Sequence, residues 1–174
     1  MTSFLDKLFG LEDRVAAITG GGGYLCGEMA RGLAKAGCKI AVMDLRGHKA
    51  EDVARDIRNS IGVEAIGLEI DASDKNAFAD GLDQTLAAFG RADILINGAG
   101  INAPTPFLDI TIGEFNDVMK SQITSTLLGC QVFGRHMLDQ GKGSIINISS
   151  ASAGPPLSKA FSYSIAKAGI LNLT

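Results

Sequence analysis

The 174-residue sequence contains no tryptophan, two histidines and three cysteines. Cys26, Cys38 and Cys130 are odd in number and widely spaced. This favours small buried side chains in a reducing compartment over a disulfide framework. His48 and His136 fall in helical patterns with no carboxylate at metal-ligand spacing, so we expect surface or packing roles and no metal site.

Long apolar runs and a strong charge of either sign are also missing. No run approaches the roughly 20 apolar residues that a membrane span needs. The formal net charge of −3 gives no reason to expect nucleic acid or an anionic membrane as a partner. The first 13 residues carry four charges and lack the apolar core of a signal peptide. We therefore expect a cytoplasmic protein in which residues 1–174 form one globular domain.

Short apolar runs alternate with longer amphipathic stretches along the chain. The runs read as strands at residues 14–19, 39–44, 65–71, 92–97 and 143–149. The stretches read as helices at residues 25–36, 48–60, 75–89 and 112–138, with a last helix beginning near Phe161. Glycines 37, 62, 90 and 141 stand where these helices should end. The alternation predicts an α/β fold: a doubly wound, Rossmann-like parallel sheet between two layers of helices.

The sequence ends at Thr174, inside the last helical pattern and without a capping signal. In a doubly wound sheet, Ile145, Ile146 and Ile148 of the fifth strand would then lie on an uncovered edge. We therefore expect a fragment, truncated after the fifth strand and the start of the following helix. The alternative is a partner chain that covers this edge.

A glycine-rich turn follows the first strand. Gly20, Gly22 and Gly23 allow a sharp turn and close approach to a pyrophosphate, and Tyr24 and Leu25 open a helix whose N-terminus attracts anions. We expect these five residues to bind a dinucleotide. A strict GxGxxG motif does not fit, because Cys26 takes the last position. An ordinary glycine-rich turn is the alternative.

Acidic residues end the next two strands. Asp44 can accept both hydroxyls of an adenosine ribose and would repel a 2′-phosphate, which favours NAD over NADP. Arg46 weakens this preference, because it could pair with a phosphate. Asp71, with Ala72 beside it, could meet the adenine edge. A strand-end turn for Asp44 and a helix N-cap for Asp71 remain the alternatives.

The fourth strand ends in small residues. Asn97, Ala99 and Gly100 follow its apolar core and leave room for the adenosine side of a dinucleotide. Asn97 could also pin this loop to neighbouring strands. As an isolated motif the segment is weak, but it gains meaning after the glycine-rich turn.

Three side chains near the end of the chain suit proton transfer to oxygen. Tyr163 and Lys167 are four residues apart, which places them on one helical face. A positive charge about 4 Å away is worth roughly 4 kcal/mol at an effective dielectric near 20, and it favours the phenolate. Tyr163 can then exchange a proton with an alcohol or ketone. Ser150, at a strand end, can donate to the substrate oxygen.

This ordered set of motifs resembles the classical short-chain dehydrogenase/reductase family. It comprises Thr19-Gly20, Asp44, Asn97-Gly98-Ala99-Gly100, Ser150 and Tyr163-x-x-x-Lys167. The resemblance implies hydride transfer between NAD(H) and a secondary alcohol or ketone, with Lys167 also holding the nicotinamide ribose. It further implies a homodimer or homotetramer that pairs through the helices at 112–138 and from Phe161 onward.

Three features depart from the family. Tyr24 and Cys26 replace glycines of the cofactor loop. Gln122 stands where the family usually has an asparagine whose backbone carbonyl holds a water linked to the lysine, so we expect a modified proton relay. The family's last third, with its substrate-covering loop, is missing.

The substrate and two other functions stay open at this stage. The Gly-Gly-Gly-Gly-x-Leu loop resembles a subgroup acting on sugar acids, such as mannonate/fructuronate and gluconate oxidoreductases; hydroxyacyl thioesters and steroids are alternatives. A catalytically silent NAD sensor is favoured by Tyr24, Cys26, Gln122 and the expected truncation. The intact Ser150, Tyr163 and Lys167 oppose it. A hydrolase with Ser150 as nucleophile lacks the G-x-S-x-G turn.

Overall fold

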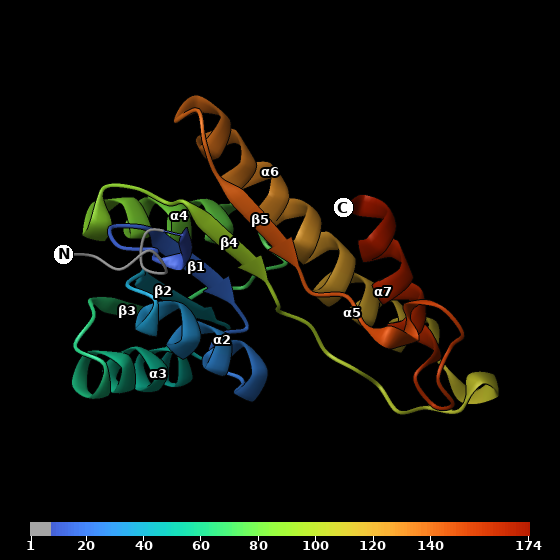
Figure 1. The fold of residues 1–174 in the computed structure, drawn as a ribbon. Helices are drawn as coiled ribbons and strands as arrows, with labels where there is room; N and C mark the ends of the chain where they lie inside the picture. Colours follow the sequence, from blue (N-terminus) through green and yellow to red (C-terminus); the bar gives the residue numbers. More distant parts are fainter. Residues whose placement is uncertain (1–7) are drawn as a thin grey trace.

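Five parallel strands form the centre of the molecule (Figure 1). The computed structural model describes residues 8–174; the expectation about a signal peptide falls in part on residues 1–7, which lie outside the described residues. The strands are β1 (Val15–Thr19), β2 (Lys39–Asp44), β3 (Ala65–Glu69), β4 (Ile94–Asn97) and β5 (Ser144–Asn147). Their order is β3-β2-β1-β4-β5, which confirms the doubly wound parallel sheet.

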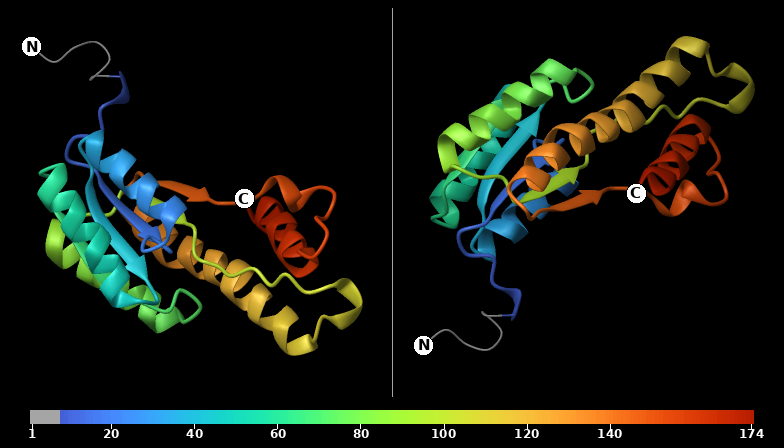
Figure 2. Two further views of the ribbon diagram at one scale, coloured as in Figure 1. Left: turned by 90° about the horizontal axis from the view of Figure 1, so that it is seen from below. Right: turned by 90° about the horizontal axis from the view of Figure 1, so that it is seen from above.

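Helices cover both faces of the sheet (Figure 2). They are α2 (Tyr24–Lys35), α3 (Gly47–Ser60), α4 (Lys75–Phe89), α5 (Ile112–Met119), α6 (Ser125–Asp139) and α7 (Phe161–Leu173), and η1 (Phe107–Asp109) and η3 (Ala151–Ala153) are short 3-10 turns. One apolar cluster joins β1 and β2 to α2 and α3, and a second joins the opposite face to α4 and α6. Among the described residues, no helix is both long and apolar enough to cross a membrane.

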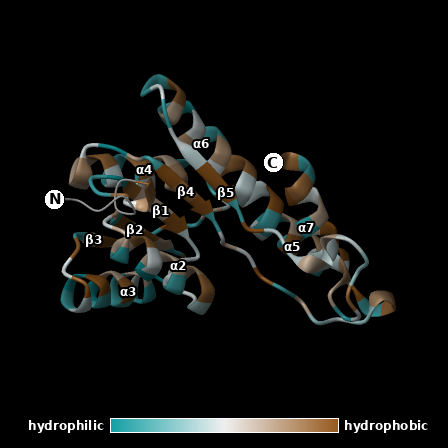
Figure 3. Cartoon of the chain, in the orientation of Figure 1, coloured by the Kyte–Doolittle hydropathy of each residue, from teal (hydrophilic) through white to brown (hydrophobic). Residues whose placement is uncertain are grey.

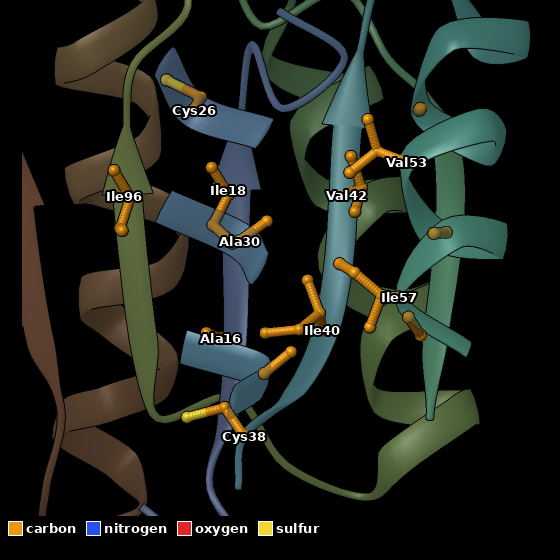
Figure 4. Packing of buried hydrophobic residues seen from close by; sticks show 14 residues of the cluster. Ala16, Ile18, Cys26, Ala30, Cys38, Ile40, Val42, Val53, Ile57 and Ile96 are labelled. Atoms are coloured by element: carbon orange, nitrogen blue, oxygen red, sulfur yellow. The ribbon is translucent and has the colours of Figure 1, made fainter. Parts of the chain in front are cut away.

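Strand residues alternate between these two clusters. In β2, Ile40 and Val42 pack under α2 and α3 (Figure 4), whereas Ala41 and Met43 pack against the α4 side. All five residues of β1 are buried. Figure 3 shows the central strands as predominantly hydrophobic ribbons. Burial on both faces explains why these strands read as continuous apolar runs.

The glycines predicted to end helices do so. Gly37, Gly62, Gly90 and Gly141 have φ angles of 98°, 80°, 75° and 76°. These left-handed angles are unfavourable for residues with a Cβ, so glycine terminates each helix at little steric cost.

The helix expected at residues 112–138 is instead three consecutive elements. A π-helical turn, η2 (Lys120–Thr124), separates α5 from α6. The hydroxyls of Ser125 and Thr126 donate to main-chain carbonyls one turn earlier, those of Ser121 and Gln122. Such back-bonding hydroxyls accommodate a local change in the helical hydrogen-bond pattern. The sequence contains no proline or glycine within the turn that would have indicated it.

The predicted uncovered edge is only partly correct. β5 is an edge strand, and Ile146 is 45% exposed. Ile145 and Ile148, however, pack against the two apolar clusters, one on each face. α7 lies apart from the sheet and packs on α5, η2 and η3 (Figure 1). Several predicted strands also run one or two residues too long, because the residues beyond them turn into the loops at the strand ends.

Candidate active site

A cleft of about 580 Å³ opens at the carboxyl ends of the parallel strands. The loop from β1 to α2, the ends of β2 and β4, the π-helical turn η2 and helix α7 all contribute to its walls. In-register pairing of the three central strands explains this, because Thr19 at the end of β1 lies opposite Met43 of β2 and Asn97 of β4. This end of an open parallel sheet is where ligands bind in doubly wound folds.

The glycine-rich turn forms one wall of the cleft. Gly20 has φ +68°, and a Cβ at this position would lie 3.0 Å from the Cα of Ala99. Gly23 is the N-cap residue of α2. Because glycine has no side chain, no side-chain cap occupies the first N–H groups of the helix. Tyr24 and Leu25 line the cleft, and Tyr24 is 88% exposed. This wall suits a pyrophosphate.

The loop after β4 is held by Thr19 and not by Asn97. The Thr19 hydroxyl accepts hydrogen bonds from the amides of Gly98 and Ala99, at 3.1 and 3.2 Å. Asn97 is turned away from the cleft and donates from Nδ2 to Asn147 Oδ1 at 2.9 Å, which ties β4 to β5. The expected link to a neighbouring strand is therefore present, but Asn97 does not line the cleft.

Asp44 is almost fully buried and accepts hydrogen bonds at both carboxylate oxygens. Oδ2 accepts from the amide of Gly22 at 3.1 Å, and Oδ1 accepts from the amide and Nε of Arg46 at 3.0 and 3.2 Å. Asp44 and Arg46 both line the cleft, whereas Gly22 does not. Gly22 lies so close to the carboxylate that a Cβ on it would be 3.0 Å from Oδ2.

Asp71 forms a turn and is not the cap of the next helix. Its Oδ1 accepts from the amide and hydroxyl of Ser73, at 2.8 and 2.7 Å. These hydrogen bonds hold the pKa of Asp71 below its usual value. Asp74 caps α4 instead, by accepting from the amides of Asn76 and Ala77. Asp71 and Ala72 both line the cleft, and their place on the adenine side stays a prediction.

Tyr163 and Lys167 lie together in the cleft. Both belong to α7, and the Nζ of Lys167 is 5.3 Å from the centre of the Tyr163 ring. Lys167 is 4% exposed, and its Nζ donates to the carbonyl of Ile148 at 2.6 Å. Burial lowers the pKa of Lys167, and the nearby thiol of Cys26 acts in the opposite direction. The shared helical face expected from their spacing is therefore present.

Ser150 lies outside the residues that line this cleft. Its hydroxyl accepts hydrogen bonds from the amide and the hydroxyl of Ser152, at 3.2 and 3.0 Å. It thereby caps the short turn η3, and because it accepts in both hydrogen bonds, neither of them uses its own O–H proton. Its neighbour Ser149 donates to the carbonyl of Lys167 at 2.9 Å and links the end of β5 to α7.

Gln122 is buried in the π-helical turn and lines the cleft. Its main-chain carbonyl accepts from the hydroxyls of Ser125 and Thr126, at 3.2 and 2.7 Å. The modified proton relay expected at this position stays a prediction. The side-chain amide instead donates to the carbonyl of Ile101 at 2.9 Å.

Sequence reasoning missed several contributors to the cleft. Cys26 lines it, and the sulfur takes the space that a Cβ on Gly98 would need, only 2.3 Å away. Ser121 and Ser125 line it from the π-helical turn. No local motif identifies them as lining residues, because the cleft is assembled from segments that lie far apart in the sequence. Within residues 8–174, no group of three potential metal ligands is found.

Comparison with known proteins identifies the family. A model of the short chain dehydrogenase family matches residues 14–174. Uncharacterized oxidoreductase UxuB of Bacillus subtilis (strain 168) is 36% identical across 94% of this chain and 64% of its own length. D-threitol dehydrogenase of Mycolicibacterium smegmatis is 30% identical across 98% of this chain and 65% of its own length.

A solved structure agrees with these sequence matches. The crystal structure of NAD⁺-bound xylitol dehydrogenase matches with a TM-score of 0.90 and 28% identity, over 94% of this chain and 63% of that one. The chain thus spans slightly less than two thirds of the length of these relatives. Its matched residues include every element that builds the cleft, from the glycine-rich turn to α7. The chain belongs to the short chain dehydrogenase family.

Proposed function

We propose that this protein is an oxidoreductase that uses NAD(H) to interconvert a secondary alcohol and a ketone. The observation that carries the proposal is the placement of Tyr163 and Lys167 in the same cleft as the glycine-rich turn and Asp44. Hydride transfer between a nicotinamide and an alcohol or ketone requires a proton-transfer group and a dinucleotide-binding surface in the same cleft.

The residues present fit a nicotinamide dinucleotide. Gly20 and Gly23 allow the backbone to approach a pyrophosphate, and the N-terminus of α2 supplies N–H donors and a partial positive charge. Asp44 and Arg46 stand where the adenosine ribose would lie, with Asp71 and Ala72 on the adenine side. The carboxylate of Asp44 favours NAD over NADP. When bound, the nicotinamide supplies the hydride acceptor or donor.

The proton chemistry belongs to Tyr163 and Lys167. Tyr163 is half-buried in the cleft and exchanges a proton with the substrate oxygen. The ammonium of Lys167, fixed by the carbonyl of Ile148, lies 5.3 Å from the centre of the Tyr163 ring and also serves the nicotinamide ribose. Ser150 polarises the substrate oxygen by donating its O–H proton, while its oxygen accepts from Ser152.

We propose a small polyhydroxylated substrate, such as a sugar acid or a polyol. The glycine-rich turn resembles the sugar-acid subgroup, and two similar proteins are named for threitol and xylitol. Polar groups of Asn102, Ser121 and Ser125 on the cleft wall suit several hydroxyls.

The test is turnover by Tyr163→Phe. Purified protein and variant are mixed with NAD and a panel of sugar acids and polyols, and reduced cofactor is followed by its absorbance. We expect Tyr163→Phe to lower kcat at least about a hundredfold, the scale of general acid–base catalysis, while the Kd for NAD changes less than about threefold. Near-normal turnover in Tyr163→Phe would remove this residue from the mechanism. NAD binding without turnover of any panel member would favour a silent sensor instead.

A further inference from the structure

Helix α7 carries both Tyr163 and Lys167 but does not pack on the faces of the sheet. It packs on α5, η2 and η3 and lies beyond the end of β5 (Figure 2). The glycine-rich turn and Asp44, which line the same cleft, are built on β1 and β2. These two groups of residues can serve one ligand only if α7 is fixed relative to the sheet.

The three residues at the end of β5 provide this attachment, because each makes one hydrogen bond to α7 or its C-cap. Asn147 Nδ2 donates to the hydroxyl of Thr174 at 3.0 Å. The other two bonds converge on Lys167. Its Nζ donates to the carbonyl of Ile148 at 2.6 Å, and its main-chain carbonyl accepts from the hydroxyl of Ser149 at 2.9 Å. Lys167 is thus held at both ends by two adjacent residues.

The groups that hold Lys167 are themselves fixed by the sheet. The amide of Ile148 donates to the carbonyl of Asn97 at 3.0 Å, and the Ile148 side chain packs on the apolar cluster under α2 and α3. The carbonyl of Ile148 therefore has little freedom. Ser149 follows directly and is half-buried. A main-chain carbonyl has two lone pairs, so that of Lys167 can accept the Ser149 proton in addition to a helical amide.

The two neighbouring serines differ in how they use their hydroxyl protons. Ser149 donates its proton to the main chain of Lys167, whereas Ser150 accepts in both of its hydrogen bonds with Ser152. A serine hydroxyl has one proton to donate. Ser149 is therefore committed to α7, and Ser150 retains a proton for another acceptor.

We propose that Ser149 is the positioning residue of Lys167. Its hydroxyl holds the main chain of α7 where the ammonium of Lys167 reaches the carbonyl of Ile148 and lies 5.3 Å from the centre of the Tyr163 ring. Without this bond, α7 is free to move away from the end of β5, and the ammonium loses its fixed place. That this place serves proton transfer rests on the proposed function; the attachment itself does not.

The test is the rate at which formaldehyde and cyanoborohydride methylate Lys167, measured for each lysine by mass spectrometry at one pH. Methylation needs an accessible amine, so a buried ammonium held by a carbonyl reacts only when the site opens. In the unsubstituted protein, Lys167 should react at least about tenfold more slowly than Lys75, which is exposed on α4. Equal rates would overturn the inference even if no variant folded.

Ser149→Ala should raise the methylation rate of Lys167 about fivefold, the scale of one lost hydrogen bond, and leave that of Lys75 unchanged. Ser149→Thr keeps the hydroxyl and should retain the slow rate of the unsubstituted protein. An unchanged rate in Ser149→Ala would overturn the inference. A rate in Ser149→Thr as fast as that in Ser149→Ala would overturn it too, because the hydroxyl would then not be the group that matters.

Thr174→Val is the matched control. It removes a bond of similar length between the same strand end and the same helix, but at the C-cap of α7 and not at Lys167. We expect the methylation rate of Lys167 to change less than about twofold. An effect equal to that of Ser149→Ala would show that any loosening of α7 exposes Lys167, and it would overturn the inference.

Ser150→Ala separates this inference from the proposed function. It should lower turnover at least about tenfold, because a donor to the substrate oxygen is lost. The methylation rate of Lys167 should stay unchanged, since the hydroxyl of Ser150 bonds to Ser152. A rise equal to that in Ser149→Ala would overturn the inference. If none of these proteins turns over a substrate, the proposed function fails, whereas the methylation rates still decide the role of Ser149.

Discussion

Asp44 binds the glycine-rich turn and Arg46 with a single buried carboxylate. This arrangement keeps the guanidinium engaged with a buried negative charge in the cleft. The proposed preference for NAD would therefore be a property of the pair. Arg46 itself is half exposed, at 53%, and becomes available to a phosphate once its partner is removed.

Asp44→Ala is expected to shift cofactor preference toward NADP. Removal of the carboxylate ends repulsion of the 2′-phosphate and frees Arg46 to pair with it. The ratio of kcat/KM for NADP to that for NAD should rise at least about tenfold, roughly 1.4 kcal/mol. The double variant Asp44→Ala/Arg46→Ala should lose most of this gain. An unchanged ratio in the single variant would show that other residues set the preference.

Asp93 gives the fold a predictable sensitivity to acid. The side chain is 4% exposed and accepts from the amide of Val15 at 3.0 Å, from Arg91 Nε at 2.6 Å and from Arg14 at 3.3 Å. Burial alone would raise the pKa of Asp93, but these donors outweigh it and hold the pKa below its usual value. A carboxyl with a lowered folded-state pKa stabilises the fold fully above its unfolded value, near about 4, and loses this contribution as the pH falls through the folded value.

Urea unfolding of the unsubstituted protein and of Asp93→Asn, compared between pH 3 and pH 7, measures this contribution. At pH 7 the variant should be less stable by about 2–3 kcal/mol, because a charged acceptor of several hydrogen bonds is lost. The difference should shrink below about pH 4, where Asp93 of the unsubstituted protein also becomes protonated. A difference that does not vary with pH would contradict this assignment.

Individual site residues differ in how well the sequence predicts them. Tyr163 and Lys167 are found correctly in one cleft, because an i, i+4 spacing is a local property of a helix. Thr19 and Cys26 appear in the sequence motifs, but their contacts with Gly98 are missed, because Gly98 is more than 70 residues away in the chain. Ser150 is correctly placed at a strand end, but its hydroxyl is directed to Ser152, and no sequence pattern indicates that choice.

At the scale of elements, helix ends are predicted better than helix interiors. A glycine at a helix end acts through its own backbone angles, so Gly37 and Gly90 can be interpreted without their neighbours. The π-helical turn at Lys120–Thr124 depends on how η2 packs against α7 and on hydroxyl bonds to main-chain carbonyls. Periodicity alone therefore predicts one continuous helix where the structure has three elements.

Two helical glycines should respond oppositely to the same substitution. Gly32 of α2 has open space where a Cβ would be, so Gly32→Ala should stabilise the fold by about 1 kcal/mol through helix propensity. At Gly129 of α6, a Cβ would lie 2.2 Å from Asn97 Oδ1 and 2.9 Å from the ring of Phe78. Gly129→Ala should therefore destabilise the fold by about 1–3 kcal/mol through overpacking. Thermal or urea unfolding measures both, and equal effects of the two substitutions would contradict the packing described for α6.

At the scale of the whole molecule, the doubly wound parallel sheet follows from the alternation of short apolar runs and helices, whereas the order β3-β2-β1-β4-β5 was not predicted. Parallel strands need crossovers, and right-handed crossovers leave few arrangements. The sequence also does not specify how α7 is placed, because this helix packs on α5, η2 and η3 and not on the faces of the sheet. That position nevertheless brings Tyr163 and Lys167 to the cleft.

The outer faces of α6 and α7 are expected to mediate self-association. Leu127 on α6 and Leu171 on α7 are 41% and 59% exposed, and the family resemblance implies pairing through these two helices. Exposed leucines on both helices suit a symmetric interface, in which each copy contributes the same residues. We therefore expect a homodimer or homotetramer in solution.

Sedimentation equilibrium on the double variant Leu127→Glu/Leu171→Glu tests this expectation. Association would bury four carboxylates without partners at a two-fold interface, and an unpaired buried charge costs about 2 kcal/mol or more. The dissociation constant should rise at least roughly thirtyfold, so that monomer dominates at micromolar concentration. Leu108→Glu is the control, because Leu108 is 92% exposed but lies on η1, outside both helices. An equal rise of the dissociation constant in Leu108→Glu would contradict the expected interface. The effect would then come from replacing any exposed leucine and not from α6 and α7.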